Sequence, residues 1–123
     1  MMHGNVVQGV MSFPEMDAMM YKIEGEDLYL IGTSEHTMIG RFIDQTLDEA
    51  TLPLTLTSYS PCFRKEKGAH GIEERGIYRI HQFEKQEMIV VCRPEESADW
   101  YEKLWKMSVE LFRSMEIPVD RKS

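Results

Sequence analysis

Apolar residues recur at helical spacing in some segments of this chain, and residue types that favour strands are concentrated in others. Spacings of three and four residues predict a short helix ending near Gly25 and another over residues 34–47, capped at its start by a hydroxyl side chain. Residues 54–64 and 77–92 are instead rich in Leu, Thr, β-branched and aromatic residues, which predicts two strands. A glycine-containing loop separates them, so we expect an extended hairpin.

The remaining segments complete the expected architecture. After Pro94, two acids and an apolar face predict a third helix, which ends at Pro118 and covers one side of the sheet. Residues 28–30 read as a further strand, whereas residues 1–9 show no periodic pattern. The pattern therefore predicts an α+β fold, an antiparallel sheet flanked by helices, in a single domain over residues 1–123.

Composition agrees with one globular domain. The chain has 123 residues, of which 42% are hydrophobic and 28% charged, enough for a modest core. No apolar run approaches the roughly 18 residues of a membrane span, and no signal-peptide pattern opens the chain, so we expect a cytoplasmic protein without a membrane partner. Cys62 and Cys92 lack the spacing of a zinc site, so we expect reduced thiols and no bound metal.

Charge is distributed unevenly along the chain. The net charge is −7, and residues 1–60 carry Lys22 and Arg41 against nine acids. Residues 61–93 instead hold seven Lys or Arg against five acids. The second segment would therefore attract a ligand that carries phosphate.

Two arginines, two glutamates and a phenylalanine stand at even spacings in the predicted strands. Arg64 and Glu66 would share one face of the first strand. Arg79, Phe83 and Glu87 would share a face of the second strand, unless a bulge intervenes. Such a surface suits a nucleotide, with arginine for phosphate, a ring for the base and carboxylates for amino groups. The alternative is a solvated sheet face, where alternating charge is ordinary.

Two longer runs favour the first interpretation. The chain reads PCFRKE at residues 61–66 and, after the loop, GIYRIHQFEKQEM at residues 76–88. These runs resemble motif 2 of class II aminoacyl-tRNA synthetases, and they are most similar to seryl-tRNA synthetases of archaeal type. The run LIGTSEH at residues 30–36 resembles the Thr-x-Glu serine-binding segment of that family, and residues 52–54 and 93–97 also fit. The resemblance covers almost the whole chain.

The resemblance implies a role for each of these side chains. Arg64 would hold the ATP α-phosphate, with Arg79 near the phosphates or the adenylate, as the two catalytic candidates. Glu66 would accept from the adenine amino group, and Phe83 would stack under the adenine. The serine-binding candidates are Thr33, Glu35 and Glu87. The candidates for contact with the tRNA acceptor end are Lys65, Lys67 and Arg75.

The function implied is that of the core of a serine-tRNA ligase. Serine reacts with ATP to give seryl-adenylate, and the seryl group passes to tRNA(Ser); the parent enzyme would be a homodimer. Motif 1, motif 3 and the tRNA-binding arm are expected outside this chain, as are most ligands of Mg²⁺. Two alternatives stay open: a ligase that charges a carrier protein, and a fragment that binds ATP or serine without turnover.

Overall fold

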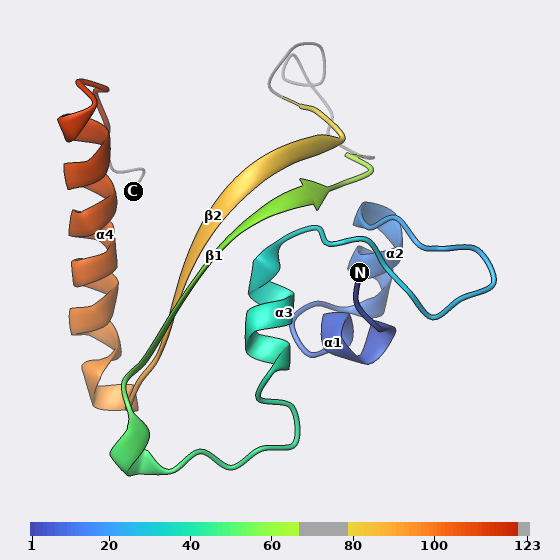
Figure 1. Ribbon diagram of the computed structural model, residues 1–123, viewed down its shortest axis with the longest axis horizontal. Helices are drawn as coiled ribbons and strands as arrows, with labels where there is room; N and C mark the ends of the chain where they lie inside the picture. The colour runs from blue at the N-terminus through green and yellow to red at the C-terminus, as the bar shows by residue number, and fades with distance from the viewer. Residues whose placement is uncertain (67–78, 121–123) are drawn as a thin grey trace. The chain divides into compact units, whose positions relative to one another are not determined.

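The chain folds into a long hairpin and several helices (Figure 1). The computed structural model describes residues 1–66 and 79–120. Two compact units form, one from residues 1–46 and 56–89 and the other from residues 47–55 and 90–123. The elements in chain order are α1 (Gly4–Gln8), α2 (Phe13–Met19), α3 (Ser34–Gly40), the 3-10 turn η1 (Glu49–Thr51), β1 (Leu54–Phe63), β2 (Gln82–Val91), the 3-10 turn η3 (Pro94–Glu96) and α4 (Ser97–Ser114).

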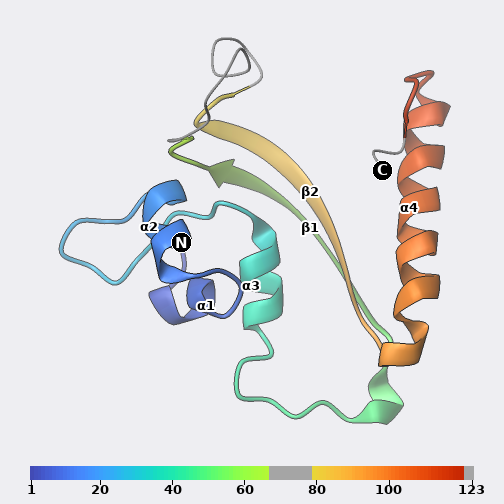
Figure 2. The ribbon, with the colours of Figure 1, turned by 180° about the vertical axis from the view of Figure 1, so that it is seen from behind.

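Strands β1 and β2 pair in an antiparallel two-stranded sheet, which confirms the predicted hairpin and the mixed α and β fold. Figure 2 shows the same two strands side by side from behind. Side chains alternate along both strands: Ser60 and Cys62 are buried, and Phe83, Lys85 and Glu87 are half-buried, while the residues between them are exposed. Period two thus gives the hairpin one covered face, and this face carries the polar groups of interest.

A small apolar core forms beside the hairpin in the first unit. It contains Met2, Val7, Met16, Met20 and Tyr29, all at most 5% exposed. Helix α1 contacts both α2 and α3, and the three helices gather together in both views (Figures 1 and 2). The methionines of this unit therefore fill a core, because their flexible side chains suit irregular gaps.

Two predicted helices are shorter than expected, and one helix was missed. Helix α2 ends at Met19 rather than near Gly25, because Met20 has extended backbone although its side chain is buried in the core. Helix α3 ends at Gly40, and the chain turns through Asp44 at φ 57°. The predicted strand at residues 28–30 is reduced to single bridges at Tyr29, and α1 lies in a segment for which no element was predicted.

Helix α4 follows Pro94, as predicted, and runs to Ser114. None of its side chains is buried, and several of its apolar residues are exposed. Leu111, for example, is 59% exposed. The expectation that it covers one side of the sheet stays a prediction. No helix in residues 1–66 and 79–120 is both long and apolar enough to cross a membrane.

Candidate functional site

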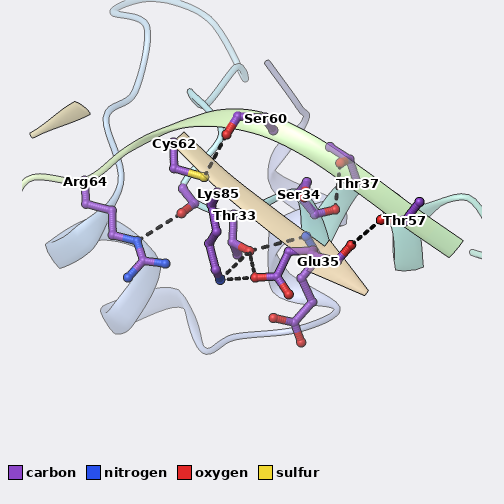
Figure 3. Close-up of polar contacts among 11 residues, drawn as sticks. Thr33, Ser34, Glu35, Thr37, Thr57, Ser60, Cys62, Arg64 and Lys85 are labelled. Atoms are coloured by element: carbon purple, nitrogen blue, oxygen red, sulfur yellow. Dashed lines mark hydrogen bonds and ion pairs between the residues drawn. The ribbon is translucent and has the colours of Figure 1, made fainter. Parts of the chain in front are cut away.

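The segment before α3 lies against the end of β1 and fixes the position of Arg64. The Phe63 amide donates to the Ile31 carbonyl at 2.7 Å, so the two segments are joined by backbone. The Arg64 Nε then donates to the Gly32 carbonyl at 2.9 Å, a bond drawn in Figure 3. The guanidinium is therefore held at Nε, while its two terminal nitrogens have no hydrogen-bond partner among the described residues.

Arg64 also lies over the ring of Phe83. The guanidinium carbon is 5.2 Å from the ring centroid, within the range of a cation–π contact. Phe83 is on the covered face of β2, so its ring is held beside the end of β1. The structure thus brings together the residue predicted for the α-phosphate and the residue predicted for the adenine.

Thr33, Glu87 and Lys85 form a polar network on the covered face of the hairpin. The Thr33 hydroxyl donates to Glu87 Oε1 at 3.4 Å and accepts from Lys85 Nζ at 3.2 Å. Lys85 also pairs with Glu87 Oε1. Figure 3 shows the labelled Lys85 and Thr33 side chains pointing toward one another from β2 and the start of α3. Two predicted serine-binding residues are therefore in contact, together with a lysine that was not predicted.

Glu35 lies at the start of α3, next to Thr33, and lines a cavity of about 320 Å³. Gly32, Thr33 and Arg64 line the same cavity, and Met19 and Met20 provide part of its apolar wall. The Glu35 carboxylate makes no hydrogen bond or ion pair within the described part of the chain. An unpaired carboxylate in a partly enclosed cavity is a suitable partner for an ammonium group.

Glu66 and Arg79 form an ion pair at the other end of the site. Arg79 Nη1 lies 2.7 Å from Glu66 Oε2, and the two side chains are 39% and 18% exposed. They line a second cavity of about 300 Å³ with Lys65 and His81. Glu66 adopts a left-handed backbone at φ 50°, an uncommon conformation for a residue other than glycine.

The expected strand faces are therefore wrong in part. Strand β1 ends at Phe63, before Arg64 and Glu66, and β2 begins at Gln82, after Arg79. The alternation of side chains along a strand therefore does not determine where these three side chains point. Phe83 and Glu87 do share a face, as predicted. Lys85 shares it too, and strict alternation would have identified it, whereas a spacing of four passed over it.

Three further contacts surround the backbone at Arg64 and Lys65. The Tyr21 hydroxyl lies 2.7 Å from His81 Nδ1, which in turn lies 3.1 Å from the Arg64 carbonyl oxygen. Lys65 Nζ donates to the Asp17 carbonyl at 2.8 Å, so this lysine contacts α2. Its predicted contact with tRNA stays a prediction. Lys67 and Arg75 lie outside the described residues.

Burial determines the state of two titratable side chains near the site. His36 is 3% exposed, and burial lowers the pKa of its imidazole, helped by Arg64 and Lys85 and opposed by Glu35. Its Nδ1 has no hydrogen-bond partner among the described residues. Burial raises the pKa of the Cys62 thiol, whose Sγ lies 3.7 Å from the Ser60 carbonyl oxygen. Both groups are therefore favoured in their neutral forms.

Within residues 1–66 and 79–120, no group of three or more His, Cys, Asp or Glu side chains could hold a metal ion. The described residues therefore do not form a metal centre of their own. The chemistry they offer is the binding of anions by arginine and of cations by carboxylates.

The amino-acid sequence resembles those of known ligases over most of its length. Serine-tRNA ligase of Thermococcus sibiricus is 50% identical over 113 residues, and that of Archaeoglobus fulgidus is 46% identical over 118 residues. These alignments cover 92% and 96% of this chain, but 25% and 26% of the two relatives. The chain thus spans about a quarter of the length of the curated relatives it matches.

Two solved structures match the fold of the chain. Seryl-tRNA synthetase from Pyrococcus horikoshii, complexed with ATP, superimposes with a TM-score of 0.84 at 46% identity, over 91% of this chain and 25% of that one. Cytoplasmic serine-tRNA ligase from Naegleria fowleri, in complex with AMP, gives 0.75 at 37% identity, over 92% and 27%. Both structures are of synthetases with an adenine nucleotide bound.

Residues 20–122 match the family described as the tRNA synthetase class II core domain (G, H, P, S and T). This match includes the segment before α3, both strands and α4, and therefore every side chain predicted to bind ATP or serine. The chain belongs to the class II tRNA synthetase core-domain family.

Proposed function

We propose that this chain forms the ATP-binding and serine-binding part of a serine-tRNA ligase. The observation that carries the proposal is that Arg64 contacts Phe83, and Thr33 contacts Glu87, at the covered face of β2. A solvated sheet face would leave these side chains exposed and apart. Here they are half-buried or buried, and the Glu35 carboxylate, which has no partner among the described residues, lines a cavity with Thr33 and Arg64.

Each group has a task that fits its chemistry. Arg64 would contact the α-phosphate through its terminal nitrogens, since Nε is already bonded to Gly32. Phe83 would stack on the adenine, a contact worth about 1–3 kcal/mol for nucleic-acid bases on other proteins. Glu66 would accept from the adenine amino group, and Arg79 would lie near the phosphates while pairing with Glu66.

The serine site would use Glu35, Glu87 and Thr33. A carboxylate opposite the serine ammonium and a polar group opposite its hydroxyl would reject amino acids that lack the hydroxyl, because buried polar groups would stay unpaired. The methionines of the cavity wall provide no such polar partner for the serine hydroxyl. Selectivity is therefore expected to depend on the glutamates and Thr33.

The reaction would be an in-line displacement. A serine carboxylate oxygen attacks the α-phosphorus of ATP, the bond to the β-phosphate oxygen breaks, and seryl-adenylate and pyrophosphate form. The ribose hydroxyl at the tRNA(Ser) end then attacks the seryl carbonyl carbon and AMP leaves. The residues of this chain would act by positioning the reactants and stabilising charge at the α-phosphate.

Other parts of the proposal rest on the resemblance to seryl-tRNA synthetases. Mg²⁺ would accompany ATP, and no cluster of side chains among the described residues fits it. Lys65, Lys67 and Arg75 would contact tRNA. The parent enzyme would be a homodimer located in the cytoplasm, and this chain would form a single partial domain of it.

Amino-acid-dependent exchange of pyrophosphate into ATP tests the proposal in the full-length protein that contains these residues. Exchange with serine but not with alanine supports the adenylation step and its selectivity. Charging of tRNA(Ser) rather than a carrier protein then identifies the acceptor. Binding of ATP and serine without any exchange would reject the ligase in favour of a binding function.

A further inference from the structure

Lys85 contacts both Thr33 and Glu87, two of the residues proposed to bind serine. It stands two residues after Phe83 and two before Glu87, so period two places all three on the covered face of β2. Its side chain is 33% exposed, and that of Glu87 is 18% exposed. A charge pair in this position is partly shielded from water, which strengthens it relative to a surface pair.

The hydrogen-bonding capacity of the Thr33 hydroxyl is fully used. It donates to Glu87 Oε1 at 3.4 Å, and it accepts from Lys85 Nζ at 3.2 Å and from the Glu35 amide at 3.4 Å. A hydroxyl has one proton to donate and two lone pairs. The Thr33 hydroxyl therefore has no free proton or lone pair for a ligand unless one of these hydrogen bonds breaks.

Glu87 has one oxygen committed and one available. Its Oε1 receives both the Lys85 ammonium and the Thr33 hydroxyl. Its Oε2 has no partner among the residues that the structure describes. The Glu35 carboxylate is likewise without a partner in this part of the chain, so these two acceptors are the ones ready for a substrate.

We propose that Lys85 is a positioning residue of the serine site. Its ammonium group fixes Glu87 and Thr33 in one orientation, so that Glu87 presents Oε2 to the substrate. Removal of the ammonium group would leave the Glu87 carboxylate free to rotate, and serine binding would have to order it. This inference rests on the proposed function, because it needs serine as the ligand.

A competing role can be separated from this one by the sign of its effect. If the Lys85 ammonium occupied the place of the serine ammonium, serine would have to displace it, and removing Lys85 would tighten binding. The unpaired Glu35 carboxylate argues against displacement, because it offers the serine ammonium a partner that Lys85 does not occupy. We therefore expect weaker binding on removal.

The test measures serine and ATP binding by calorimetry in the full-length protein with Lys85→Met, Lys85→Gln or Lys85→Arg. Lys106→Met is the matched control, since it removes an exposed lysine that pairs with Glu102 on α4. Without Lys85, serine affinity should fall about tenfold and ATP affinity should change less than about twofold. Lys85→Arg should restore part of the serine affinity, and Lys106→Met should change neither ligand.

Unchanged or tighter serine binding in the folded variants would overturn the role of Lys85, and so would equal losses for serine and ATP. Melting temperatures identify a variant that has lost its fold; Lys85→Gln and Lys85→Arg then decide in place of Lys85→Met. Failure of the unsubstituted protein to bind serine would overturn the proposed function itself, and the role of Lys85 with it. Normal serine binding by that protein separates the two failures.

Discussion

The guanidinium of Arg79 donates to the carboxylate of Glu66 at 2.7 Å, so two residues expected to act on different parts of ATP are joined to each other. Their pairing coincides with the left-handed backbone of Glu66 at φ 50°. Strained backbone often persists where surrounding contacts maintain it, and Arg79 supplies one such contact here. The ion pair therefore orients Glu66 through Oε2, while its other oxygen has no partner among residues 1–66 and 79–120.

Replacing Glu66 by alanine should weaken ATP binding and reduce the preference for ATP over GTP. Adenine presents an amino group where guanine presents a carbonyl oxygen, and a carboxylate can accept from the first but not the second. We expect about a tenfold loss for ATP and a smaller change for GTP. Calorimetry with both nucleotides checks this. The control is Glu84→Ala on the exposed face of β2, and equal losses for the two nucleotides would contradict the role.

Replacing Arg64 by lysine should slow pyrophosphate exchange more than it weakens ATP binding. Arginine can bond to the Gly32 carbonyl through Nε while its two terminal nitrogens contact phosphoryl oxygens. Lysine ends in a single nitrogen and cannot make this arrangement. Loss of such a charge-stabilising donor typically costs about 10²-fold in rate. The exchange rate and the ATP affinity are compared in a full-length variant with an unchanged melting temperature. Near-normal exchange would remove Arg64 from the catalytic candidates.

His36 should make the fold less stable at acidic pH. Burial lowers its pKa in the folded chain below the unfolded value of about 6.5, so the unfolded chain binds the proton more readily. The free energy of unfolding should therefore be greatest above about pH 7 and fall as the pH drops below about 6.5. Urea unfolding of the original chain and of the His36→Gln variant, measured across this pH range, checks the prediction. Parallel pH profiles would show that His36 contributes nothing.

Cys92 should react with iodoacetamide before Cys62. The Cys62 side chain is fully buried and burial raises its pKa, so little thiolate forms and the reagent cannot reach it. Cys92 is half-buried and open to attack. Mass spectrometry of the labelled chain, with and without urea, distinguishes the two thiols. Equal labelling rates in the folded chain would contradict the burial of Cys62.

The sequence predicted the hairpin well because its signal is local. Residue types that favour strands identified both strands, and side-chain alternation correctly placed Phe83 and Glu87 on one face. Helix ends were less predictable, since Met20 continues the apolar spacing of α2 after the helix has ended. Its side chain is buried by tertiary packing, which apolar spacing alone does not separate from helix.

The resemblance predicted which residues the candidate site would contain, but not how they pair. It predicted roles for Thr33, Arg64 and Glu87, and Thr33 and Glu87 contact each other. The pairing of Arg79 with Glu66 could not, because it depends on backbone beyond the ends of both strands. Side-chain alternation carries no information once the strands have ended.

The hydroxyl oxygen of Thr33 belongs to two structures at once. It receives the Glu35 amide as the N-cap of α3, and it meets Glu87 and Lys85 from the hairpin. Any movement of that network is therefore felt by the first turn of the helix. Fraying of α3 and occupation of the pocket become coupled equilibria, and the rate at which the Glu35 amide exchanges its hydrogen with solvent would report on both.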